Sequence, residues 1–386
     1  MKRICIVTTV PETISFFLKN HIKVISQFYD VTIVTNIDHN FEMNLPSKIN
    51  LIPVEIKRNI DLLTDIKSLF SLKKIFNKEK FDLVLSVTPK AGLLASLASC
   101  LSGIKIKLHW FTGQVWSSKQ GFKRFFLKLI DKLIVRCVNY ALVDSQSQFN
   151  FLISEKVLDL KKGNVLGKGS ISGVDLNYFK FNSNIKKTFR KKIGLNEFDN
   201  VVIFLGRLNR DKGIYDLVES FNLINNEVKN LHLVLVGPDE QKVREVLFKS
   251  KKLNPNIHFI GKTLEPQKWL CVGDIFCLPS YREGFGTSVI EAAAIGIPSI
   301  TSRIYGLTDA VIEGQTGLMH QVGDIEEIAN AIKLLINDKK LRYNLGNNAK
   351  KRAELYFSQS HMSELFLEFI NEIFSDKKHS IKINKI

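Results

Sequence analysis

Apolar and polar positions follow two periods that alternate along the whole chain. Short runs rich in Val, Ile, Leu and Phe are each followed by a segment in which apolar residues recur every three or four positions. The short runs are typical of buried strands and the longer segments of amphipathic helices, so the pattern predicts βαβ units with parallel sheets. The expected strands are residues 3–9, 29–36, 49–55, 81–88, 105–111, 140–145, 201–207, 231–238, 257–262, 274–280 and 298–303.

The two series of strands predict two domains. A chain of 386 residues is long enough for two separate hydrophobic cores. We expect an α/β fold in which two doubly wound, Rossmann-like domains, residues 1–178 and 179–357, face each other across a cleft. The seam is expected in the polar, basic stretch 180–200, which has no strand character.

The end of the chain has a helical pattern. Helices are expected at residues 325–338, 339–357 and 358–374. We expect the last of them to complete the first domain, followed by a polar tail at residues 375–386. Because open parallel sheets bind ligands at the carboxyl ends of their strands, the cleft between the domains is the expected active site.

The net charge of +17 is unevenly distributed. Residues 1–180 hold 26 Lys and Arg against 14 Asp and Glu. This excess predicts an anionic partner for the first half, with biased codon usage as the alternative explanation.

Cysteine usage and hydropathy bear on the cellular compartment. The five cysteines are never spaced as Cys-x-x-Cys and mostly lie in apolar runs, so we expect reduced core residues of a cytosolic protein. The most apolar helix-sized stretch, residues 91–103, is too short to cross a bilayer. We therefore do not expect a membrane-spanning protein.

The sequence REGFGTSVIE, residues 282–291, combines a glycine turn with two glutamates. It follows an apolar strand, and Thr287 or Ser288 can cap the helix that comes next. A strand, a glycine loop and a helix start form an anion site from backbone N–H groups. Glu283 on the loop and Glu291 one turn into the helix can both accept hydrogen bonds from sugar hydroxyls in one pocket. A structural turn with surface glutamates is the alternative.

A second motif, GRLNRDKG at residues 206–213, follows another buried strand. Gly206 permits a turn, and Arg207 and Lys212 then follow at the carboxyl end of the strand. Two cations in this place can neutralise a departing diphosphate. The chain has no Asp-x-Asp motif and no ligand-like histidine spacing, so we expect no metal site. A solvated loop is the alternative interpretation.

The two motifs, in this order, resemble the retaining glycosyltransferases of family 4, which have the two-domain GT-B fold. The first half adds VTPKAGLLASLAS, HWFTGQVW, DSQSQFNFLISE and GSISGVDLNYF. Together they are similar to bacterial polysaccharide, O-antigen or capsule, and glycan-assembly transferases acting on undecaprenyl-diphosphate-linked sugars. These include N,N'-diacetylbacillosaminyl-diphospho-undecaprenol alpha-1,3-N-acetylgalactosaminyltransferases. The resemblance covers nearly the whole chain, although the first strand lacks the Gly-Gly loop of many relatives.

The resemblance implies residue roles. Arg207 and Lys212 would hold the donor diphosphate and stabilise the leaving group, Glu291 would bind the ribose, and Glu283 would hold the donor sugar. His109, expected in a loop, would lie near the transferred sugar, with a structural histidine as the alternative. The donor, expected to be a UDP-N-acetylhexosamine, is a substrate, and no cofactor is expected. Further donor contacts are expected from Gly206, Gly284, Phe285, Gly286 and Thr287.

Retention can proceed without a covalent intermediate. The leaving diphosphate can itself take the proton from the attacking hydroxyl on the same face of an oxocarbenium-like sugar. Double displacement with Glu283 as the nucleophile is the less favoured route.

The acceptor is expected to be a lipid-linked saccharide bound by the first domain. Lys90, Thr112 and Gly113 are the candidate acceptor contacts. Residues 119–137 predict a basic amphipathic helix that can lie on an anionic membrane surface, or simply pack its apolar face on the sheet. We expect a peripheral protein on the inner face of the bacterial cytoplasmic membrane. The apolar stripe comprises Phe122, Phe125, Phe126, Leu129, Ile130, Leu133, Ile134 and Cys137, with Lys123, Arg124, Lys128, Lys132 and Arg136 mostly outside it.

Two other functions compete with glycosyl transfer. A GT-B-like sugar-nucleotide epimerase would convert its substrate without an acceptor. A basic nucleic-acid-binding protein would share the charge, but the chain has no RNP-like, zinc-finger or helix-turn-helix signature, and we expect no nucleic-acid partner. The sequence does not predict the oligomeric state.

Overall fold

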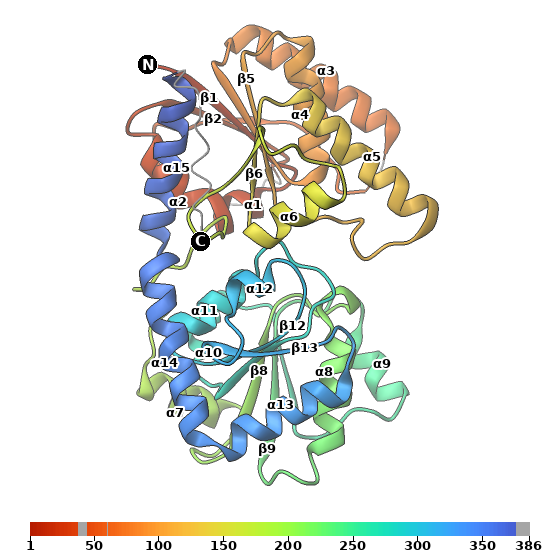
Figure 1. The fold of residues 1–386 in the computed structure, drawn as a ribbon, viewed down its shortest axis with the longest axis vertical. Coiled ribbons are helices and arrows are strands. Elements are labelled where there is room, and N and C mark those ends of the chain that lie inside the picture. Colours follow the sequence, from red (N-terminus) through yellow and green to blue (C-terminus); the bar gives the residue numbers. More distant parts are fainter. Residues whose placement is uncertain (38–44, 60, 376–386) are drawn as a thin grey trace. The chain divides into compact units, whose positions relative to one another are not determined.

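The protein forms two units, each with its own sheet and core (Figure 1). A computed structural model describes residues 1–37, 45–59 and 61–375. The N-terminal unit comprises Met1–Ser172 together with the chain from Gln359 onward, and the C-terminal unit comprises Gly173–Ser358. From residue 376 the predicted tail lies outside the described residues.

The division between the units differs from the predicted one. Residues 173–178, predicted to be in the first domain, belong to the C-terminal unit. Val174 is buried in the core of that unit, and its N–H donates to the carbonyl of Phe357 at 2.7 Å. This contact joins residues far apart in the sequence, so no local pattern revealed it.

The N-terminal unit contains a seven-stranded parallel sheet with strand order β3-β2-β1-β4-β5-β6-β7. Alternate residues of β1 face opposite layers: Ile4 and Ile6 pack against α2 and α15, and Cys5 and Val7 against α3 and α4. The strands are β1 (Arg3–Val7), β2 (Asp30–Thr35), β3 (Asn50–Pro53), β4 (Leu83–Val87), β5 (Ile106–Phe111), β6 (Tyr140–Val143) and β7 (Gly163–Val165).

Helices cover both faces of this sheet. The C-terminal helix α15 packs beside α2, with Phe366 and Ile370 buried next to Ile22 (Figure 1). The helices are α1 (Pro11–Thr13), the π-helical segment η1 (Ile14–Leu18), α2 (Lys19–Ile25), α3 (Leu62–Glu79), α4 (Pro89–Leu101), α5 (Gly121–Cys137), α6 (Gln146–Ser154) and α15 (Gln359–Phe374).

The C-terminal unit contains a six-stranded parallel sheet with strand order β10-β9-β8-β11-β12-β13. All eleven predicted strands are present in the two sheets. Among the strands of the described residues, β7 and β13 lacked a prediction. The strands are β8 (Asn200–Leu205), β9 (Leu231–Val236), β10 (Ile257–Gly261), β11 (Ile275–Leu278), β12 (Ser299–Ser302) and β13 (Gly317–His320).

The helices of this unit include two of the three predicted near the end of the chain, α13 and α14. Asp338 ends α13 and caps α14, because its Oδ1 accepts a hydrogen bond from the N–H of Leu341 at 2.8 Å. The helices are α7 (Ser183–Lys192), the 3-10 turn η2 (Arg210–Lys212), α8 (Ile214–Ile224), α9 (Val243–Lys249), α10 (Pro266–Leu270), α11 (Thr287–Ile295), α12 (Leu307–Ala310), α13 (Ile325–Asn337) and α14 (Lys339–Tyr356).

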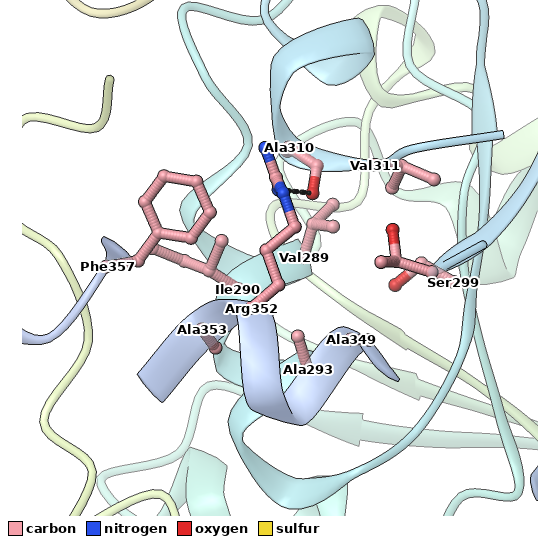
Figure 2. Close-up of a pocket in the computed structure, with 11 residues that line it drawn as sticks. Val289, Ile290, Ala293, Ser299, Ala310, Val311, Ala349, Arg352, Ala353 and Phe357 are labelled. Carbon is pink, nitrogen blue, oxygen red and sulfur yellow. Dashed lines mark hydrogen bonds between the residues drawn. The ribbon is translucent and has the colours of Figure 1, made fainter. Parts of the chain in front are cut away.

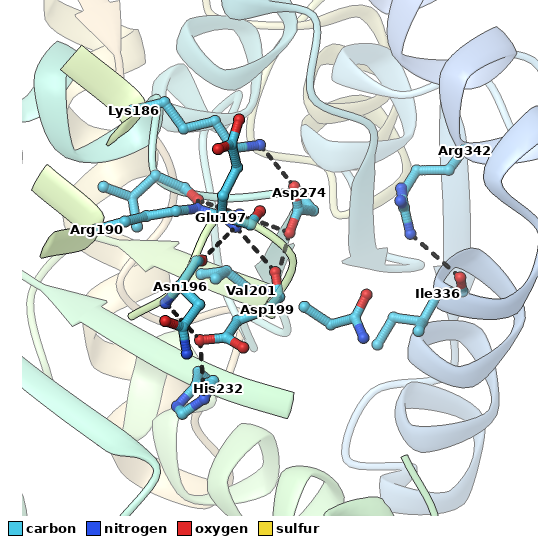
Figure 3. A network of polar contacts seen from close by, with 12 residues as sticks. Lys186, Arg190, Asn196, Glu197, Asp199, Val201, His232, Asp274, Ile336 and Arg342 are labelled. Atoms are coloured by element: carbon cyan, nitrogen blue, oxygen red, sulfur yellow. Dashed lines mark hydrogen bonds and ion pairs between the residues drawn. The ribbon is translucent and has the colours of Figure 1, made fainter. Parts of the chain in front are cut away.

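The stretch 180–200, predicted to contain the seam, is part of the C-terminal unit instead. It forms α7, whose Arg190 is only 2% exposed (Figure 3). Arg190 Nη2 is 2.8 Å from Asp274 Oδ2, and its Nη1 donates to the carbonyl of Asp199 at 2.9 Å. A buried guanidinium needs such partners, so the basic composition that suggested a solvated linker anchors this helix.

Both sheets have a topological switch point, where the order of the strands reverses. In the C-terminal unit this point lies between β8 and β11, and in the N-terminal unit between β1 and β4. Open α/β sheets bind ligands at this point.

Candidate active site

Lys212 and Glu283 meet at the switch point of the C-terminal unit. Lys212 ends the turn after β8, and Glu283 lies in the loop after β11. Lys212 Nζ is 2.5 Å from Glu283 Oε1, and the same oxygen accepts a hydrogen bond from Ser280 Oγ at 2.8 Å. The two side chains are only 19% and 10% exposed. Partial burial and the ion pair hold the ammonium group in a defined position, and Ser280 holds the carboxylate that it contacts.

Asn209 joins Lys212 to the neighbouring Arg207. Arg207 Nη1 is 3.2 Å from Glu240 Oε2 in the loop after β9, and Asn209 Nδ2 donates to the same oxygen at 2.8 Å. Asn209 Oδ1 accepts a hydrogen bond from the N–H of Lys212 at 3.1 Å. The predicted cations Arg207 and Lys212 thus lie on one connected set of loops, but Arg207 is 47% exposed and less constrained.

A close backbone approach allows the loops after β8 and β11 to meet. Gly213 has a φ of 68°, and a Cβ atom there would lie 1.9 Å from the carbonyl oxygen of Pro279. Tyr281 N–H donates to the carbonyl of Asp211 at 2.9 Å across the same contact. Only glycine fits here, so the final residue of GRLNRDKG is required for Lys212 to reach Glu283.

Helix α11 begins at Thr287, directly after the glycine turn. Its N-cap is Gly286, with a φ of 90°, and no side chain caps the helix. The prediction that Thr287 or Ser288 provides the cap was therefore wrong. A Cβ on Gly286 would lie 2.6 Å from Leu307 Cδ2, so packing favours glycine over a capping side chain.

Glu291 lies one turn into α11 in an unusual environment. Burial raises the pKa of its carboxyl group to about 7. Among the described residues its carboxylate has no hydrogen-bond or ion-pair partner. Burial, Glu265 and Glu291 raise the pKa of Tyr178, whose hydroxyl donates to the carbonyl of Leu264 at 3.0 Å. A half-buried carboxylate without a partner can accept hydrogen bonds from a ligand.

Phe285 contributes to packing and not to a ligand surface. It is 2% exposed and contacts Phe357 edge-on, with ring centroids 5.2 Å apart. Behind it, α11 and α14 enclose a cavity of about 10 Å³, where Arg352 donates to the carbonyl of Ala310 at 2.8 Å (Figure 2). This cavity is far too small for a nucleotide. Only the backbone of Phe285 is therefore available to contact a sugar-nucleotide donor.

Several site residues escaped the sequence analysis. Asn209, Glu240, Ser280 and Tyr178 all contact or surround the predicted charges. The spacing of Asn209 three residues before Lys212 is an N-cap pattern that could have indicated the turn. Ser280 lies only three residues before Glu283, at the end of the predicted strand 274–280. Glu240 and Tyr178 come from distant segments, and no local signal points to them.

His109 lies in strand β5, within the predicted strand 105–111, and not in the loop in which it was expected near the transferred sugar. It is 1% exposed, and its Nδ1 is 2.8 Å from Ser86 Oγ. Its ring packs so closely on α4 that a Cβ on Gly92 would come within 2.4 Å of His109 Cε1. Burial lowers the pKa of His109 to about 3, so the ring is neutral. These contacts are those of a packed strand histidine, and its predicted place near the transferred sugar stays a prediction.

The other predicted acceptor residues lie at strand ends of the N-terminal unit. Lys90, at the start of α4, is 15% exposed and pairs with Asp65 of α3 at 2.6 Å, so its charge is already compensated. Thr112 and Gly113 follow β5 directly, with Thr112 partly exposed and Gly113 buried.

The predicted amphipathic helix is α5, and its apolar stripe is only partly buried. Ile134 packs into the core, whereas Phe122 is 79% and Phe125 64% exposed. Two of the predicted basic residues are not free: Arg124 and Lys128 both pair with Glu155, at 2.8 and 2.6 Å. The remaining exposed apolar residues of the stripe are Phe126, Leu129 and Leu133.

Helix α3 exposes a second apolar stripe that the sequence analysis did not identify. Its neighbour α4 lies between it and α5 in the same layer (Figure 1). The exposed residues of this stripe are Leu62, Leu63, Ile66 and Phe70.

The expectation that the cysteines are core residues is correct for only part of the set. Cys5, Cys271 and Cys277 are buried, but Cys100 is exposed and Cys137 half-buried. Within the described residues, no group of His, Cys, Asp and Glu side chains is arranged to hold a metal ion. Over the same residues, no helix is both long and apolar enough to span a bilayer.

Comparison with known proteins identifies the family. A family model described as glycosyl transferases group 1 matches residues 185–352, and one described as glycosyl transferase 4-like matches residues 3–140. The chain is 33% identical to the capsular polysaccharide biosynthesis glycosyltransferase CapM of Staphylococcus aureus, over 83% of this chain and 85% of that one. The protein is a group 1 glycosyltransferase. The family prediction is confirmed, and neither alternative function is favoured.

A second relative supports this assignment, and a solved structure shows the fold. The group 1 glycosyltransferase is 26% identical to the N,N'-diacetylbacillosaminyl-diphospho-undecaprenol alpha-1,3-N-acetylgalactosaminyltransferase of Campylobacter jejuni, over 80% of this chain and 81% of that one. It shares its fold with Anabaena Alr3699/HepE, solved in complex with UDP and glucose, with a TM-score of 0.80, 17% identity and coverage of 96% and 100% of the two chains. The predicted GT-B fold class of two Rossmann-like domains is confirmed.

Proposed function

We propose that this glycosyltransferase moves a hexose or N-acetylhexosamine from a uridine diphosphate donor to an undecaprenyl-diphosphate-linked sugar in bacterial surface polysaccharide or glycan assembly. The names of its relatives support the polysaccharide and the lipid-linked acceptor, and the UDP complex of a protein with the same fold supports the donor. The observation that carries the proposal is the Lys212–Glu283 pair beside α11, whose Glu291 carboxylate is unpartnered.

The donor binds at the switch point of the C-terminal unit in this proposal. Lys212 and Arg207 neutralise the diphosphate, together with the backbone N–H groups at the start of α11. Both cations are paired with carboxylates before the donor binds. The diphosphate therefore shares or replaces partners whose positions are already set. Such preorganisation lowers the cost of stabilising the leaving group.

The two glutamates then hold hydroxyl groups. Glu291 accepts hydrogen bonds from the ribose, which supply the partners that its carboxylate lacks. Glu283 holds the donor sugar through the oxygen that is not bound by Lys212 and Ser280. A carboxylate stabilised by a lysine and a hydroxyl is a poor nucleophile. This favours retention by attack on the same face, with the leaving diphosphate accepting the proton, over double displacement through Glu283.

The charges of the site also suit a reaction without a metal. Lys212 and Arg207 together provide two positive charges for the two phosphates of the donor. Guanidinium and ammonium groups stabilise phosphoryl charge as a divalent ion does, although each contributes less.

The N-terminal unit binds the acceptor in this proposal, on the inner face of the cytoplasmic membrane. The apolar stripes of α5 and α3 are bordered by Lys123, Lys132 and Lys67. Exposed aromatic side chains beside lysines are suited to the interface of an anionic bilayer. Binding of α5 and α3 to the bilayer surface would bring the enzyme to an acceptor that is anchored in the membrane.

A donor screen followed by a transfer assay tests the proposal. Sugar nucleotides are first ranked by the thermal stabilisation that they give the protein, because a ligand that binds only the folded state raises the melting temperature. The best donor is then offered undecaprenyl-diphosphate sugars, with and without a chelator. Transfer with retained anomeric configuration and no loss on chelation is expected. Conversion of the sugar nucleotide without an acceptor would contradict the proposal.

A further inference from the structure

The loop between β5 and α5 carries Thr112 and Gly113, which the proposed function assigns to the acceptor, and the inference below rests on that function. Trp116 of this loop is 1% exposed. Its indole Nε1 donates to Asp131 Oδ2 at 2.7 Å, and its ring stacks on Phe151 with centroids 5.2 Å apart. The loop is therefore fixed by a side chain that enters the core.

Helix α5 supplies most of the other contacts of Trp116. The guanidinium of Arg124 lies 5.1 Å and Lys128 Nζ lies 5.7 Å from the indole ring. Arg124 also donates to the carbonyl of Ser117 at 3.2 Å. Glu155, directly after α6, pairs with both cations, so they remain close to the ring. The first half of α5 and the loop consequently form one packed unit.

A second anchor holds the start of the loop. Gln114, 1% exposed, accepts a hydrogen bond at Oε1 from Gln148 Nε2 at 3.0 Å. Gln148 Oε1 in turn accepts from the N–H of Asp144 at 3.1 Å, at the end of β6. Between them, the two anchors leave Thr112 and Gly113 little freedom to move independently of β6 and α5.

The buried carboxyl group of Asp131 is the least expected part of this arrangement. It is 5% exposed, and burial raises its pKa to about 7, an increase that the indole N–H opposes. An apolar pair of similar volume would pack at this place at a lower desolvation cost. A buried polar pair fixes one orientation of the ring where apolar packing would permit several.

The apolar stripe of α5 faces the solvent. Phe122, Phe125 and Leu129 are exposed, and Asp131 lies on the opposite, inner side. Any shift of α5 therefore moves Trp116, which is only three residues from Gly113.

We propose that Trp116 and Asp131 are positioning residues that hold the Thr112–Gly113 turn in register with α5. They set the affinity for the lipid-linked acceptor without touching it. Through them, the position of α5 on a lipid surface determines the geometry of the acceptor turn.

Three variants and a matched control test this role in the full-length enzyme. Trp116→Phe keeps an aromatic ring at this position but removes the N–H donor and some buried volume. Asp131→Leu removes the acceptor, and Asp131→Asn retains an acceptor oxygen of the same shape. The control is Trp269→Phe in the C-terminal unit, where Trp269 contacts Phe189 edge-on at 5.0 Å. Melting temperatures establish which variants fold. If Asp131→Leu does not fold, Trp116→Phe and Asp131→Asn still test the proposal.

Two readouts separate positioning from stability. In Trp116→Phe and Asp131→Leu, hydrogen exchange of amides 112–117 is expected to accelerate about tenfold, the effect of losing one charge-assisted hydrogen bond. The KM for the lipid-linked acceptor is expected to rise by about the same factor, with the donor KM unchanged. Asp131→Asn is expected to stay close to the parent enzyme, and Trp269→Phe to leave amides 112–117 and the acceptor KM unchanged.

The outcomes distinguish this inference from the proposed function. Transfer by the parent enzyme, combined with an unchanged acceptor KM in Trp116→Phe and Asp131→Leu, overturns the positioning role alone. An equal rise of the donor and acceptor KM also overturns it, since it indicates a general loss of structure. A parent enzyme that transfers no sugar to any lipid-linked acceptor refutes the proposed function, and the positioning role with it.

Discussion

The two units share a sheet topology but differ in the chemistry of their switch points. In the C-terminal unit, charged side chains follow β8, β9 and β11, and they form ion pairs on connected loops. In the N-terminal unit, hydroxyl groups occupy the corresponding place, with Thr9 Oγ1 2.7 Å from Thr88 Oγ1. The nearest predicted charge, Lys90, also forms an ion pair, with Asp65 at 2.6 Å.

This contrast shows what the topology contributes and what the side chains contribute. The strand order supplies a crevice at each switch point. Two cations, each paired with a glutamate, follow the strands at the switch point of the C-terminal unit, whereas two hydroxyl groups occupy that place in the N-terminal unit. Four predictions test the contrast.

The largest effect is expected for Lys212→Ala. Removing a fixed cation from the leaving group should lower kcat by about 10²–10³. Lys252→Ala is the matched control, because Lys252 also pairs with a glutamate, Glu219, but on the exposed surface. Steady-state kinetics with the best donor would measure both variants. Full activity of Lys212→Ala would contradict the role of this cation in holding the diphosphate at the switch point of the C-terminal unit.

His109→Gln should affect stability and not donor affinity. Loss of the contact with Ser86 and of close packing on α4 should reduce the free energy of unfolding by about 2 kcal/mol. His258→Gln, in a half-buried site of the C-terminal unit, should cost less. Urea denaturation measures the difference, and a large loss of kcat at unchanged stability would restore His109 as a catalytic residue.

The pH dependence of stability provides a second measurement on the same residue. Burial lowers the pKa of His109 to about 3 in the folded protein. The stability that comes from burying the neutral ring is therefore fully present above the pKa of the unfolded state, and it is lost as the pH falls below that value. The unfolded pKa is about 6.5, and one such histidine steepens the loss by up to about 1.4 kcal/mol per pH unit. The free energy of unfolding of His109→Gln should therefore fall less steeply with decreasing pH than that of the parent protein.

Glu291→Gln should weaken donor binding by about tenfold, the difference between a charged and a neutral hydrogen-bond acceptor. Since the pKa of Glu291 is about 7, the parent protein should bind its donor more tightly as the pH rises through neutrality, and the variant should not. The raised pKa also means that ionisation of Glu291 costs stability with rising pH. The variant is therefore expected to be at least as stable as the parent above neutral pH. Calorimetric titration at several pH values would reveal a parallel dependence in both proteins if Glu291 did not bind the donor.

The smallest effect is expected on the surface of the N-terminal unit. The double variant Phe122→Ser, Phe125→Ser should reduce binding to anionic liposomes severalfold at low salt, with little change in melting temperature. Phe198→Ser is the control, because Phe198 is 90% exposed in the C-terminal unit. Equal binding of the parent protein, the double variant and Phe198→Ser in a sedimentation assay would show that the exposed stripes do not bind the membrane.

Much of the site in the C-terminal unit was predictable because it is encoded locally. GRLNRDKG and REGFGTSVIE each contain a strand end, a glycine turn and charged residues within a few positions. Parallel strands bring such ends to one edge of the sheet, so the meeting of Lys212 and Glu283 follows from topology. The site in the N-terminal unit was not predictable in this way, since the state of His109 depends on Ser86 and Gly92 of other elements.

Most of the strand order, the two-domain α/β class and the family follow from the amino-acid sequence, because each is carried by local periodicity or by short motifs. The tertiary structure alone decided which polar side chains are compensated. Arg190 lies in a segment that resembles a solvated linker but is buried against Asp274, and Lys90 is paired with Asp65. Burial and charge pairing arise from residues that are distant in the sequence, and their energies depend on local solvent exposure, which no local pattern of residues contains.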